Sequence, residues 1–370
     1  MSTAKTFNPN TEPYVAPGKR LRNLLSQEGI CVQAPGVYDG ICARVAIEQG
    51  FQVMYQSGAM TTAARLGRAD LAFASLADFA ANAQMIAHLD PRVPLVADAD
   101  TGFGAPPNIA RMVQVYHQSG VAGFHIEDQV ANKRCGHLQG KAVVDMERMR
   151  RKKKKKTEAH RRPFAIGGWG RARVAVVVAA AADWLTFFLF AGFRTWKSRI
   201  RACVIGRGSI YGGSDIVIIA RTDAMAVEGY DAALERLVAA RECGADMGFL
   251  EAIETEEQIK KAVKVLAPMP KLTDWLCDKL MINFVSRGKT PWFPVETLGA
   301  WGVKLAIYPG QAAKSVLHTI REAYQCLRET GKDHAESKGL DPRGFFDIMG
   351  LEREMEIDRL AGGADFSHGA

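Results

Sequence analysis

The chain repeats one pattern along its length: a short apolar run followed by a stretch with helical periodicity. Eight such runs occur, several of them ending in glycine, aspartate or proline; they begin at Ile30, Phe51, Val93, Val121, Asp215, Ala245, Leu280 and Val303. The stretches between them, such as residues 76–89, 108–120 and 229–244, place apolar residues at helical spacing. The runs are nearly all apolar, which is typical of parallel strands covered on both faces. The pattern therefore predicts an α/β fold with a parallel sheet.

Eight strand–helix units predict a closed (β/α)8 barrel of the TIM type, formed as a single domain by residues 1–370. The alternative is a doubly wound open sheet, but no GxGxxG sequence follows the first strand. After the eighth strand, residues 311–331 and 345–363 read as two further helices that a minimal barrel does not need. Their apolar stripes indicate that the C-terminal part, residues 311–370, contacts other subunits.

Polar side chains recur at the point where the predicted strands end. They are Tyr55, Ser57, Asp98, Asp100, Glu127, Arg221, Glu251 and Asn283. In a barrel the carboxyl ends of the strands converge on one face, where the catalytic groups of such enzymes lie. Each residue taken alone reads as readily as a cap or a turn, but their recurrence on five or more strand ends predicts one shared site.

Three of these residues are carboxylates on adjacent strands. Asp98 and Asp100 occur together in "VADADTG", and Glu127 in "HIEDQ" ends the next strand. A few carboxylates, with water and substrate oxygens completing an octahedron, are typical of Mg²⁺, and Mn²⁺ is the alternative ion. The other interpretation is that Asp98 and Asp128 only cap the helices or loops that follow.

Residues 132–141, "NKRCGHLQGK", have the composition of a mobile loop with Gly136 and Gly140 as hinges. Cys135 lies among basic side chains, which lower the pKa of a thiol and favour the thiolate; they are Lys133, Arg134, His137 and Lys141. A cysteine in this setting can donate or accept a proton. The residues alone leave a thiol without a chemical role equally open.

Arg221 follows a buried strand in "ARTDA", where its guanidinium can hold a carboxylate through two parallel hydrogen bonds. The alternative is a structural ion pair with Glu251 on the neighbouring strand, and both can hold at once. Residues 288–292, "GKTPW", form a second turn that can face an anion. Together these groups predict a small carboxylate substrate.

Taken together, the motifs resemble those of the isocitrate lyase and phosphoenolpyruvate mutase superfamily. The matching stretches extend from about Ala16 to Pro309, apart from residues 149–192, and are "PGVYDG", "YQSG", "VADADTGFG", "HIEDQV", "KRCGH", "IIARTDA", "FLEA" and "NFVSRGKTP". The resemblance implies a (β/α)8 barrel, a bound Mg²⁺ ion and a substrate that passes through the enolate of a 2-oxo acid. It also implies a homotetramer with exchanged helices.

The resemblance assigns roles to the positions that match these motifs. The metal shell, completed in part through water, would be formed by Asp70 in "GRADL" with Asp98, Asp100 and Glu127. The catalytic residues would be Tyr55, Cys135, His137 and Arg221. The substrate-binding residues would be Ser57, Gly58, Arg221, Glu251, Asn283 and Thr290.

Cys135 bears on which reaction to expect. Superfamily members that cleave carbon–carbon bonds carry K(K/R)CGH, whose cysteine is thought to protonate the leaving carbanion. "KRCGH" and the modest length look more like methylisocitrate and dimethylmalate lyases and fungal oxaloacetate hydrolases than like isocitrate lyase. We therefore expect a Mg²⁺-dependent carbon–carbon lyase for a small 2-hydroxy di- or tricarboxylate. The alternatives are an oxaloacetate hydrolase giving oxalate and acetate, a phosphonomutase, and an inactive barrel that serves as a scaffold.

The rim of the predicted pocket departs from the superfamily pattern. Ser286 and Arg287 in "NFVSRGKTP" replace a usual acid–glycine pair, and the preceding "PKLTDWLCDK" looks longer than usual. Both changes bear on substrate choice.

Residues 149–192 differ in composition from the rest of the chain. They contain eleven basic and two acidic residues, a net charge of +9 where the whole chain carries +8, so the remainder carries −1. The main body therefore gives no support to nucleic-acid binding. A nuclear signal, a membrane span over residues 174–192 and a surface insertion are three interpretations. Asp183 makes a span costly, and a span inside a barrel connection would break the closure of the sheet, so we expect no membrane insertion.

A fourth interpretation explains more: residues 149–192 are a translated, unspliced intron of a eukaryotic gene. The superfamily has a crossover helix soon after "VVDME", and the sequence from Phe193 supplies it. Codons for "RM" can contain a splice donor, and codons for "DWLTFFLFAG" can contain a branch point, a pyrimidine tract and an acceptor. Splicing would join "DMER" to "FRTW".

The cysteines and the first residues bear on the compartment. Seven cysteines occur without paired spacing, and the first twenty residues contain no apolar leader. This predicts a reducing environment and a cytoplasmic enzyme.

Overall fold

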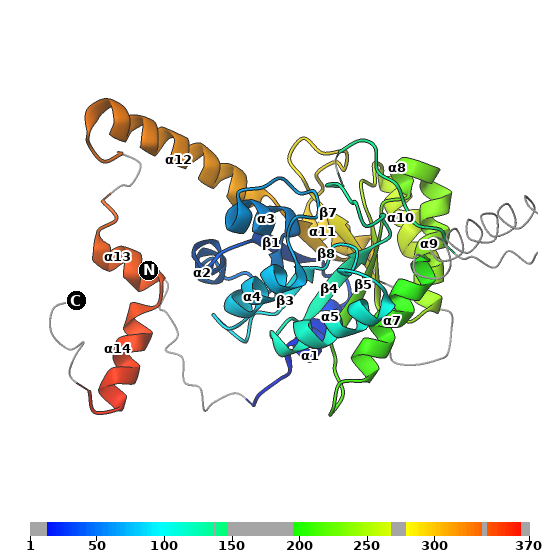
Figure 1. Cartoon of the computed structure of the whole chain (residues 1–370), viewed down its shortest axis with the longest axis horizontal. Coiled ribbons are helices and arrows are strands. Elements are labelled where there is room, and N and C mark those ends of the chain that lie inside the picture. Colours follow the sequence, from blue (N-terminus) through cyan, green and yellow to red (C-terminus); the bar gives the residue numbers. More distant parts are fainter. Residues whose placement is uncertain (1–12, 137, 147–194, 268–278, 335–338, 364–370) are drawn as a thin grey trace, which may run out of the picture.

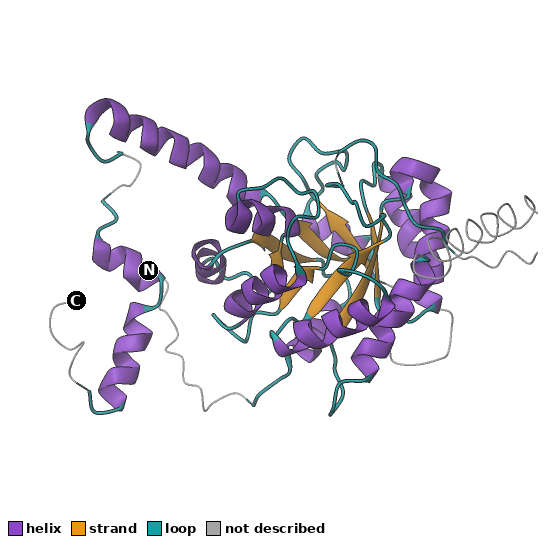
Figure 2. Cartoon of the chain, viewed as in Figure 1, coloured by secondary structure: helices purple, strands orange, loops and turns teal. Residues whose placement is uncertain are grey.

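The computed structural model describes residues 13–136, 138–146, 195–267, 279–334 and 339–363. Eight parallel strands close into a barrel in sequence order (Figures 1 and 2). They are β1 (Val32–Val37), β2 (Met54–Gln56), β3 (Leu95–Asp98), β4 (Gly123–Glu127), β5 (Val217–Thr222), β6 (Met247–Leu250), β7 (Leu280–Asn283) and β8 (Val303–Tyr308). The last strand pairs with the first in parallel register. The predicted (β/α)8 barrel is confirmed.

Helices cover the outside of this barrel (Figure 2). They are α1 (Pro17–Leu25), α2 (Gly40–Glu48), α3 (Gly58–Leu66), α4 (Leu76–Ala87), α5 (Pro106–Gln118), α7 (Trp196–Gly208), α8 (Met225–Glu228), α9 (Tyr230–Glu242), α10 (Glu256–Leu266) and α11 (Val295–Ala300). Several begin at a side chain that accepts a hydrogen bond from the first turn, namely Asp39, Ser57, Ser75, Thr195 and Thr255. These caps satisfy amide groups that the helix itself leaves unpaired.

Strand alternation decides which side chains enter the barrel. On β4, Phe124 and Ile126 pack in the apolar layer under the helices, whereas His125 and Glu127 take the intervening positions. On β6, Phe249 belongs to the inner apolar cluster. Residues two positions apart on a strand face the same side of the sheet. Because the carboxyl ends of all the strands meet at one end of the barrel, their polar side chains gather around one mouth.

The amino-terminal end of the barrel is closed by α1. Leu21 and Leu25 are fully buried and join the inner apolar cluster. The Arg22 guanidinium donates to the Asp215 carbonyl, just before β5 begins, at 2.9 Å. α1 therefore covers this end of the barrel, and the polar residues at the strand ends lie at the other end.

The connection between β4 and β5 contains the segment of unusual composition. Residues 149–192 lie outside the described residues, as does Phe193. The crossover helix expected after them is α7, which begins at Trp196. The Trp196 amide donates to the Asp145 carbonyl at 2.9 Å, so a backbone hydrogen bond joins the two flanks of the segment. In the part of the chain that the structure describes, no helix is long and apolar enough to cross a membrane.

The C-terminal helices extend away from the barrel (Figure 1). α12 (Gln311–Thr330) has no buried residue, and exposed apolar side chains including Leu317, Ile320 and Tyr324 line it. The second predicted helix, residues 345–363, is wrong as one element, because the chain forms α13 (Pro342–Ile348) and α14 (Leu351–Leu360). Gly350, with φ of 97°, separates them, a backbone conformation that a continuous helix cannot contain.

Candidate active site at the carboxyl ends of the strands

The polar residues predicted from the strand ends surround one mouth of the barrel. Tyr55, Ser57, Asp98, Glu127, Arg221, Glu251 and Asn283 come from six different strands or the residue just after them, and all are buried. Contacts link them across strands. Arg221 Nε lies 3.4 Å from Glu127 Oε2, Arg221 Nη2 lies 3.5 Å from Glu251 Oε2, and the Asn283 amide donates to Glu251 at 3.2 Å. The structure therefore joins β4 to β7 through one polar network.

The acidic side of the mouth is built around Asp98. Its carboxylate accepts hydrogen bonds from the Gly58 amide at 3.2 Å and the Asp100 amide at 2.9 Å. A Cβ on Gly58 would lie 2.5 Å from Asp98 Oδ2, so this approach requires glycine. Asp100 itself has φ of 45°, a strained conformation of the kind often found at functional sites. The sequence predicted the acidic residues but not the backbone that orients them.

Lys133 is a cation that the sequence analysis placed only in the cysteine loop. Its ammonium lies 2.7 Å from Asp70 Oδ1 and 2.5 Å from Asp100 Oδ1, with the side chain buried. Burial alone would lower the pKa of Lys133, but Asp100, Glu127 and the other carboxylates raise it well above its usual value. Lys133 is therefore a charged group that offsets part of the negative charge of the acidic side.

The buried carboxylates differ in how readily they ionise. Burial raises the pKa of Asp100 to about 7, and burial raises the pKa of Glu127 well above its usual range. For Asp98 burial acts in the same direction, but His125, Lys133 and Arg221 bring its pKa below the ordinary value. Among the described residues, the carboxylates of the acidic side outnumber the two cations beside them, Lys133 and Arg221. A further cation would therefore favour full ionisation of these carboxylates.

The acidic side chains fit a hard divalent cation in their chemistry. Both carboxylate oxygens of Glu127 are buried and accept no hydrogen bond from the described residues. Among those same residues, no three His, Cys, Asp or Glu side chains converge as a ready metal cage. An oxygen-only set that supplies one or two direct ligands and leaves room for water suits Mg²⁺, which retains several waters in most protein sites. The predicted ligands Asp70, Asp98, Asp100 and Glu127 remain a prediction.

Tyr55 and His125 lie inside the barrel below the acidic side. The Tyr55 hydroxyl lies 2.8 Å from His125 Nε2, and the same nitrogen lies 3.6 Å from Asp98 Oδ1. Burial raises the pKa of Tyr55 well above its usual value and lowers the pKa of His125 to about 4. Both side chains are therefore neutral near pH 7. His125 was missed because a lone histidine in an apolar strand gives no signal in the sequence.

Arg221 is held on several sides. Its Nε donates to Asp223 Oδ2 at 2.9 Å and its Nη2 donates to Asp223 Oδ1 at 3.3 Å. Its guanidinium also lies over the Phe249 ring, 5.3 Å from the centroid. The ion pair with Glu251 named as the structural alternative is present, and Asp223 adds a stronger partner. The pairing could have been predicted from "RTD", because Asp223 follows Arg221 by two residues and therefore lies on the same strand face.

The cysteine loop lies against this network. A Cβ on Gly136 would lie 2.5 Å from Arg221 Nη2 and 2.9 Å from Glu251, so the backbone at the loop tip packs directly on both side chains. Cys135, next to it, is half-buried. His137 lies outside the described residues. The structure thus places the predicted cysteine beside the predicted carboxylate clamp.

The remaining predicted residues lie around the rim. Ser57 caps α3, with its hydroxyl accepting from the Met60 amide at 3.4 Å. Thr290 is buried in the connection after β7, and Ser286 and Arg287 in the same connection are exposed. Next to them, the ring of Phe284 stacks on Trp292 and Tyr308 with centroids 5.3 and 5.5 Å away. This apolar platform was not predicted.

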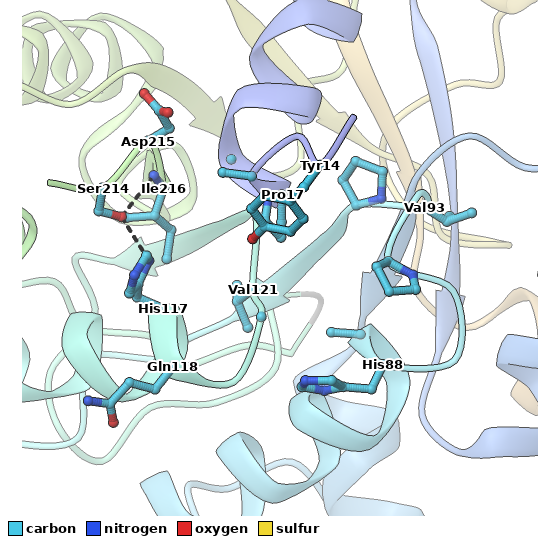
Figure 3. Close-up of a pocket in the computed structure, with 16 residues that line it drawn as sticks. Tyr14, Pro17, His88, Val93, His117, Gln118, Val121, Ser214, Asp215 and Ile216 are labelled. Carbon is cyan, nitrogen blue, oxygen red and sulfur yellow. Dashed lines mark hydrogen bonds between the residues drawn. The ribbon is translucent and has the colours of Figure 1, made fainter. Parts of the chain in front are cut away.

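A separate cavity of about 330 Å³ lies at the opposite end of the barrel (Figure 3). Its lining comes from residues that precede β3, β4 and β5, including Val93, Val121 and Ser214. His117 Nδ1 lies 3.0 Å from the Ser214 hydroxyl there. None of the predicted site residues lines it, so it is distinct from the mouth described above.

Buried acids, a buried arginine and a cysteine loop at the carboxyl mouth place the chain among the (β/α)8-barrel enzymes. Within that class, the chain belongs to the phosphoenolpyruvate phosphomutase family, whose model matches residues 21–183 and 199–328. The superfamily resemblance of the motifs is confirmed.

Individual relatives are similar along most of the chain. A 2-methylisocitrate lyase of Aeropyrum pernix is 32% identical over 356 residues, which cover 95% of this chain and 94% of that protein. A solved oxaloacetate acetylhydrolase bound to 3,3-difluorooxalacetate is 39% identical, with a TM-score of 0.75 and coverage of 95% and 99%. A solved 2,3-dimethylmalate lyase of the same superfamily is 37% identical, with a TM-score of 0.76 and coverage of 97% and 99%.

A more distant neighbour shares the fold. A phosphonopyruvate hydrolase solved with oxalate and Mg²⁺ is 21% identical, with a TM-score of 0.67 and coverage of 93% and 99%. The chain is an enzyme of the isocitrate lyase and phosphoenolpyruvate mutase superfamily and groups with its lyases.

Proposed function

We propose that the chain cleaves a carbon–carbon bond in a small 2-hydroxy di- or tricarboxylate of the methylisocitrate or dimethylmalate type, in a Mg²⁺-dependent reaction. The 2-hydroxyl group would lose its proton to a base at the mouth and become the carbonyl group of the released 2-oxo acid. The other fragment would take the electrons of the broken bond as an enolate-like carbanion and would then be protonated. One observation carries the proposal: the tip of the Cys135 loop packs on Arg221 and Glu251, beside the buried acidic residues. Under this proposal, a proton donor, a carboxylate clamp and a cation-binding face would share one mouth. The similarity to lyases with such substrates supports the substrate class.

Mg²⁺ would be held by Asp98, Asp100, Glu127 and Asp70, in part through water, and when bound it would stabilise negative charge on the oxygen at the 2-position of the substrate. The residues of the chain would do the rest. Tyr55, Ser57 and Gly58 would hold the 2-oxo acid end of the substrate, with the neutral Tyr55 hydroxyl available as a hydrogen-bond donor.

Arg221 would hold a substrate carboxylate through two parallel hydrogen bonds, with Glu251, Asn283 and Thr290 further around the pocket. Cys135 would donate a proton from Sγ to the carbon that departs, and His137 would be the second catalytic residue of the same loop. Closing the loop tip onto Arg221 would also exclude water from the reacting carbon atoms.

Oxaloacetate hydrolysis is the second candidate. In that reaction water adds to the 2-oxo carbon of oxaloacetate and loses a proton as oxalate forms. The bond to the methylene carbon breaks, and that carbon takes up a proton to leave as acetate. The 39% identity to an oxaloacetate acetylhydrolase favours it, and the altered rim at Ser286 and Arg287 bears on the choice between the two. Phosphonomutase chemistry ranks below both, and an inactive scaffold is the candidate from another class.

The exposed helix α12 and the cysteines bear on the oligomeric state and the cellular location of the enzyme. The exposed apolar side chains of α12 support contacts with other copies of the chain, and we propose a homotetramer. The unpaired cysteine spacing supports a cytoplasmic location.

A substrate panel tests the proposed function. The full chain, and a variant lacking residues 149–192, are incubated with Mg²⁺ and methylisocitrate, dimethylmalate, isocitrate, oxaloacetate or phosphoenolpyruvate, with and without a chelator, and the products are identified by NMR. Chelator-sensitive release of pyruvate or of another 2-oxo acid supports the lyase. Release of oxalate and acetate supports the hydrolase, and no turnover of any compound by either form supports the scaffold.

A further inference from the structure

The loop that carries Cys135 is fixed at its base. Gln129 and Val143 form an antiparallel bridge, and the Val144 amide donates to the Asp128 carbonyl at 2.8 Å. The Gln129 side chain also donates to the Arg134 carbonyl at 2.9 Å. Both ends of the loop are therefore bonded to each other and to the end of β4, which holds the base of the loop against the barrel.

The tip meets the barrel at Gly136. Space for a side chain is absent there, since a Cβ would lie within 2.5 to 2.9 Å of Arg221 and Glu251. Both neighbours are buried, and each is bonded to a further side chain, Arg221 to Asp223 and Glu251 to Asn283. The contact therefore defines one closed position of the tip and, with it, the position of the adjacent Cys135.

One side chain connects this tip to the barrel. The Lys141 ammonium donates to the Gly136 carbonyl at 2.6 Å and to Asp223 Oδ1 at 2.7 Å. Its side chain is only 4% exposed and that of Asp223 is fully buried, so water does not compete for the ion pair. Lys141 therefore bonds the tip to the same carboxylate that accepts two hydrogen bonds from Arg221.

The charges around Arg221 give this bond a second consequence. Three carboxylates lie within 3.5 Å of the guanidinium, those of Asp223, Glu127 and Glu251. Burial acts to raise the pKa of Asp223, but Arg221 and Lys141 together bring it below its usual value. Without Lys141, Arg221 would be the one described cation within bonding distance of Asp223. Lys141 thus neutralises part of the negative charge of Asp223 that Arg221 would otherwise neutralise alone.

We propose that Lys141 is a positioning residue, a latch that holds the loop tip closed with Cys135 above the pocket and frees Arg221 to bind the substrate carboxylate. The second half of this statement rests on the proposed function. The first half concerns the loop alone and is measurable without any substrate.

Alkylation of Cys135 tests the latch in the full chain. Iodoacetamide is added without substrate, and the modification of each cysteine is followed by mass spectrometry of its peptide. Lys141→Met removes the charge and keeps most of the stem, and Lys141→Arg restores a charged donor. Lys261→Met is the matched control, since the Lys261 ammonium pairs with Asp231 at a similar 2.9 Å but with the lysine side chain 56% exposed.

We expect Cys135 to be alkylated about tenfold faster or more in Lys141→Met, because loss of a buried ion-pair partner destabilises the closed tip. The rate in Lys141→Arg should lie between those of Lys141→Met and the wild type, and Lys261→Met should match the wild type. Cys326 on α12 should react at one rate in every variant. Wild-type reactivity of Cys135 in Lys141→Met would overturn the latch.

The fully buried Cys203 monitors folding in the same experiment. If Lys141→Met exposes Cys203, then Lys141→Gln, which keeps a neutral donor, decides the question by the same comparison. Exposure of Cys203 in both would make Lys141 a general stabilising residue and would also overturn the proposal.

Once a substrate is found, steady-state kinetics of the Lys141 variants give a second test of the latch. Lys141→Met should lower kcat about tenfold or more, with a smaller change in KM, since the closed tip is needed after binding. An unchanged kcat would refute the link to Arg221 and Cys135. If the wild type turns over nothing, the proposed function fails, while the alkylation rates still decide whether Lys141 holds the tip.

Discussion

Replacing Gly136 by alanine should impair catalysis without unfolding the protein. Gly136 has no positive φ, so its backbone accepts alanine, and the effect comes from the added methyl group alone. That Cβ would lie 2.5 Å from Arg221 Nη2 and 2.9 Å from Glu251 Cγ and Cδ. Inserting a methyl group into a packed contact of this kind costs about 1–3 kcal/mol.

The loop tip can avoid this cost by staying open, so the penalty should fall on the closed state. At 1.36 kcal/mol per tenfold change, kcat should fall by roughly fivefold to 150-fold. The thermal midpoint should change by less than about 2 °C, since the rest of the barrel is untouched. Steady-state kinetics on the substrate identified by the panel, with calorimetry or circular dichroism for the midpoint, provide both numbers.

Gly208→Ala is the control for Gly136→Ala, because its added Cβ would have no atom of the described residues within 4 Å apart from its chain neighbours and its own helix backbone, and Gly208 is exposed. It should keep the wild-type kcat. A Gly136→Ala enzyme with wild-type kcat would refute the reasoning, since the closed contact could then not be part of the catalytic cycle. A large loss of thermal stability would also contradict it, because the tip would then support the fold.

Three further predictions follow from other parts of the structure. Cys135→Ser should lower kcat for cleavage by about 10² to 10⁴-fold while Mg²⁺ binding measured by calorimetry stays unchanged, and full activity would remove the thiol from the mechanism. Burial raises the pKa of Asp128 to about 6 in the folded protein, above roughly 3.9 in the unfolded chain, so the folded state retains its proton longer and stability falls as the pH rises from 4 to 6. Asp128→Asn should remove a difference of roughly 3 kcal/mol over this interval in urea unfolding, and an unchanged pH slope would contradict that pKa. Deleting residues 149–192 leaves Met146–Arg148 and Phe193–Thr195 between Asp145 and Trp196, whose backbones already bond at 2.9 Å. The barrel should therefore keep or raise its thermal midpoint. Loss of folding would show that the segment is needed.

The barrel could be predicted because its strands carry their own signal. Parallel strands covered on both faces need nearly continuous apolar residues, and all eight runs that begin between Ile30 and Val303 contain or closely precede a strand. The polar residues at the strand ends were predicted for the same reason, since their place in the fold follows from the strand alone. The break at Gly350 was missed because an apolar stripe continues across it.

Partners from distant parts of the chain could not be predicted. Lys133 bonds to Asp70, which lies before β3, and Lys141 bonds to Asp223, which follows β5. A sequence shows that these groups are charged, but the pairing depends on how the loop after β4 folds over the mouth. His125 and its contact with Tyr55 required knowing that both strands face inward at the same level.

The most direct test of the central claim is calorimetric titration of the full chain with oxalate, a planar analogue of a 2-oxo acid enolate. Oxalate should bind in the presence of Mg²⁺, a chelator should abolish the binding, and Asp98→Asn should weaken it strongly. Equal affinity with and without Mg²⁺, or an Asp98→Asn protein that binds as the wild type does, would contradict the assignment of the acidic mouth as the metal-dependent site.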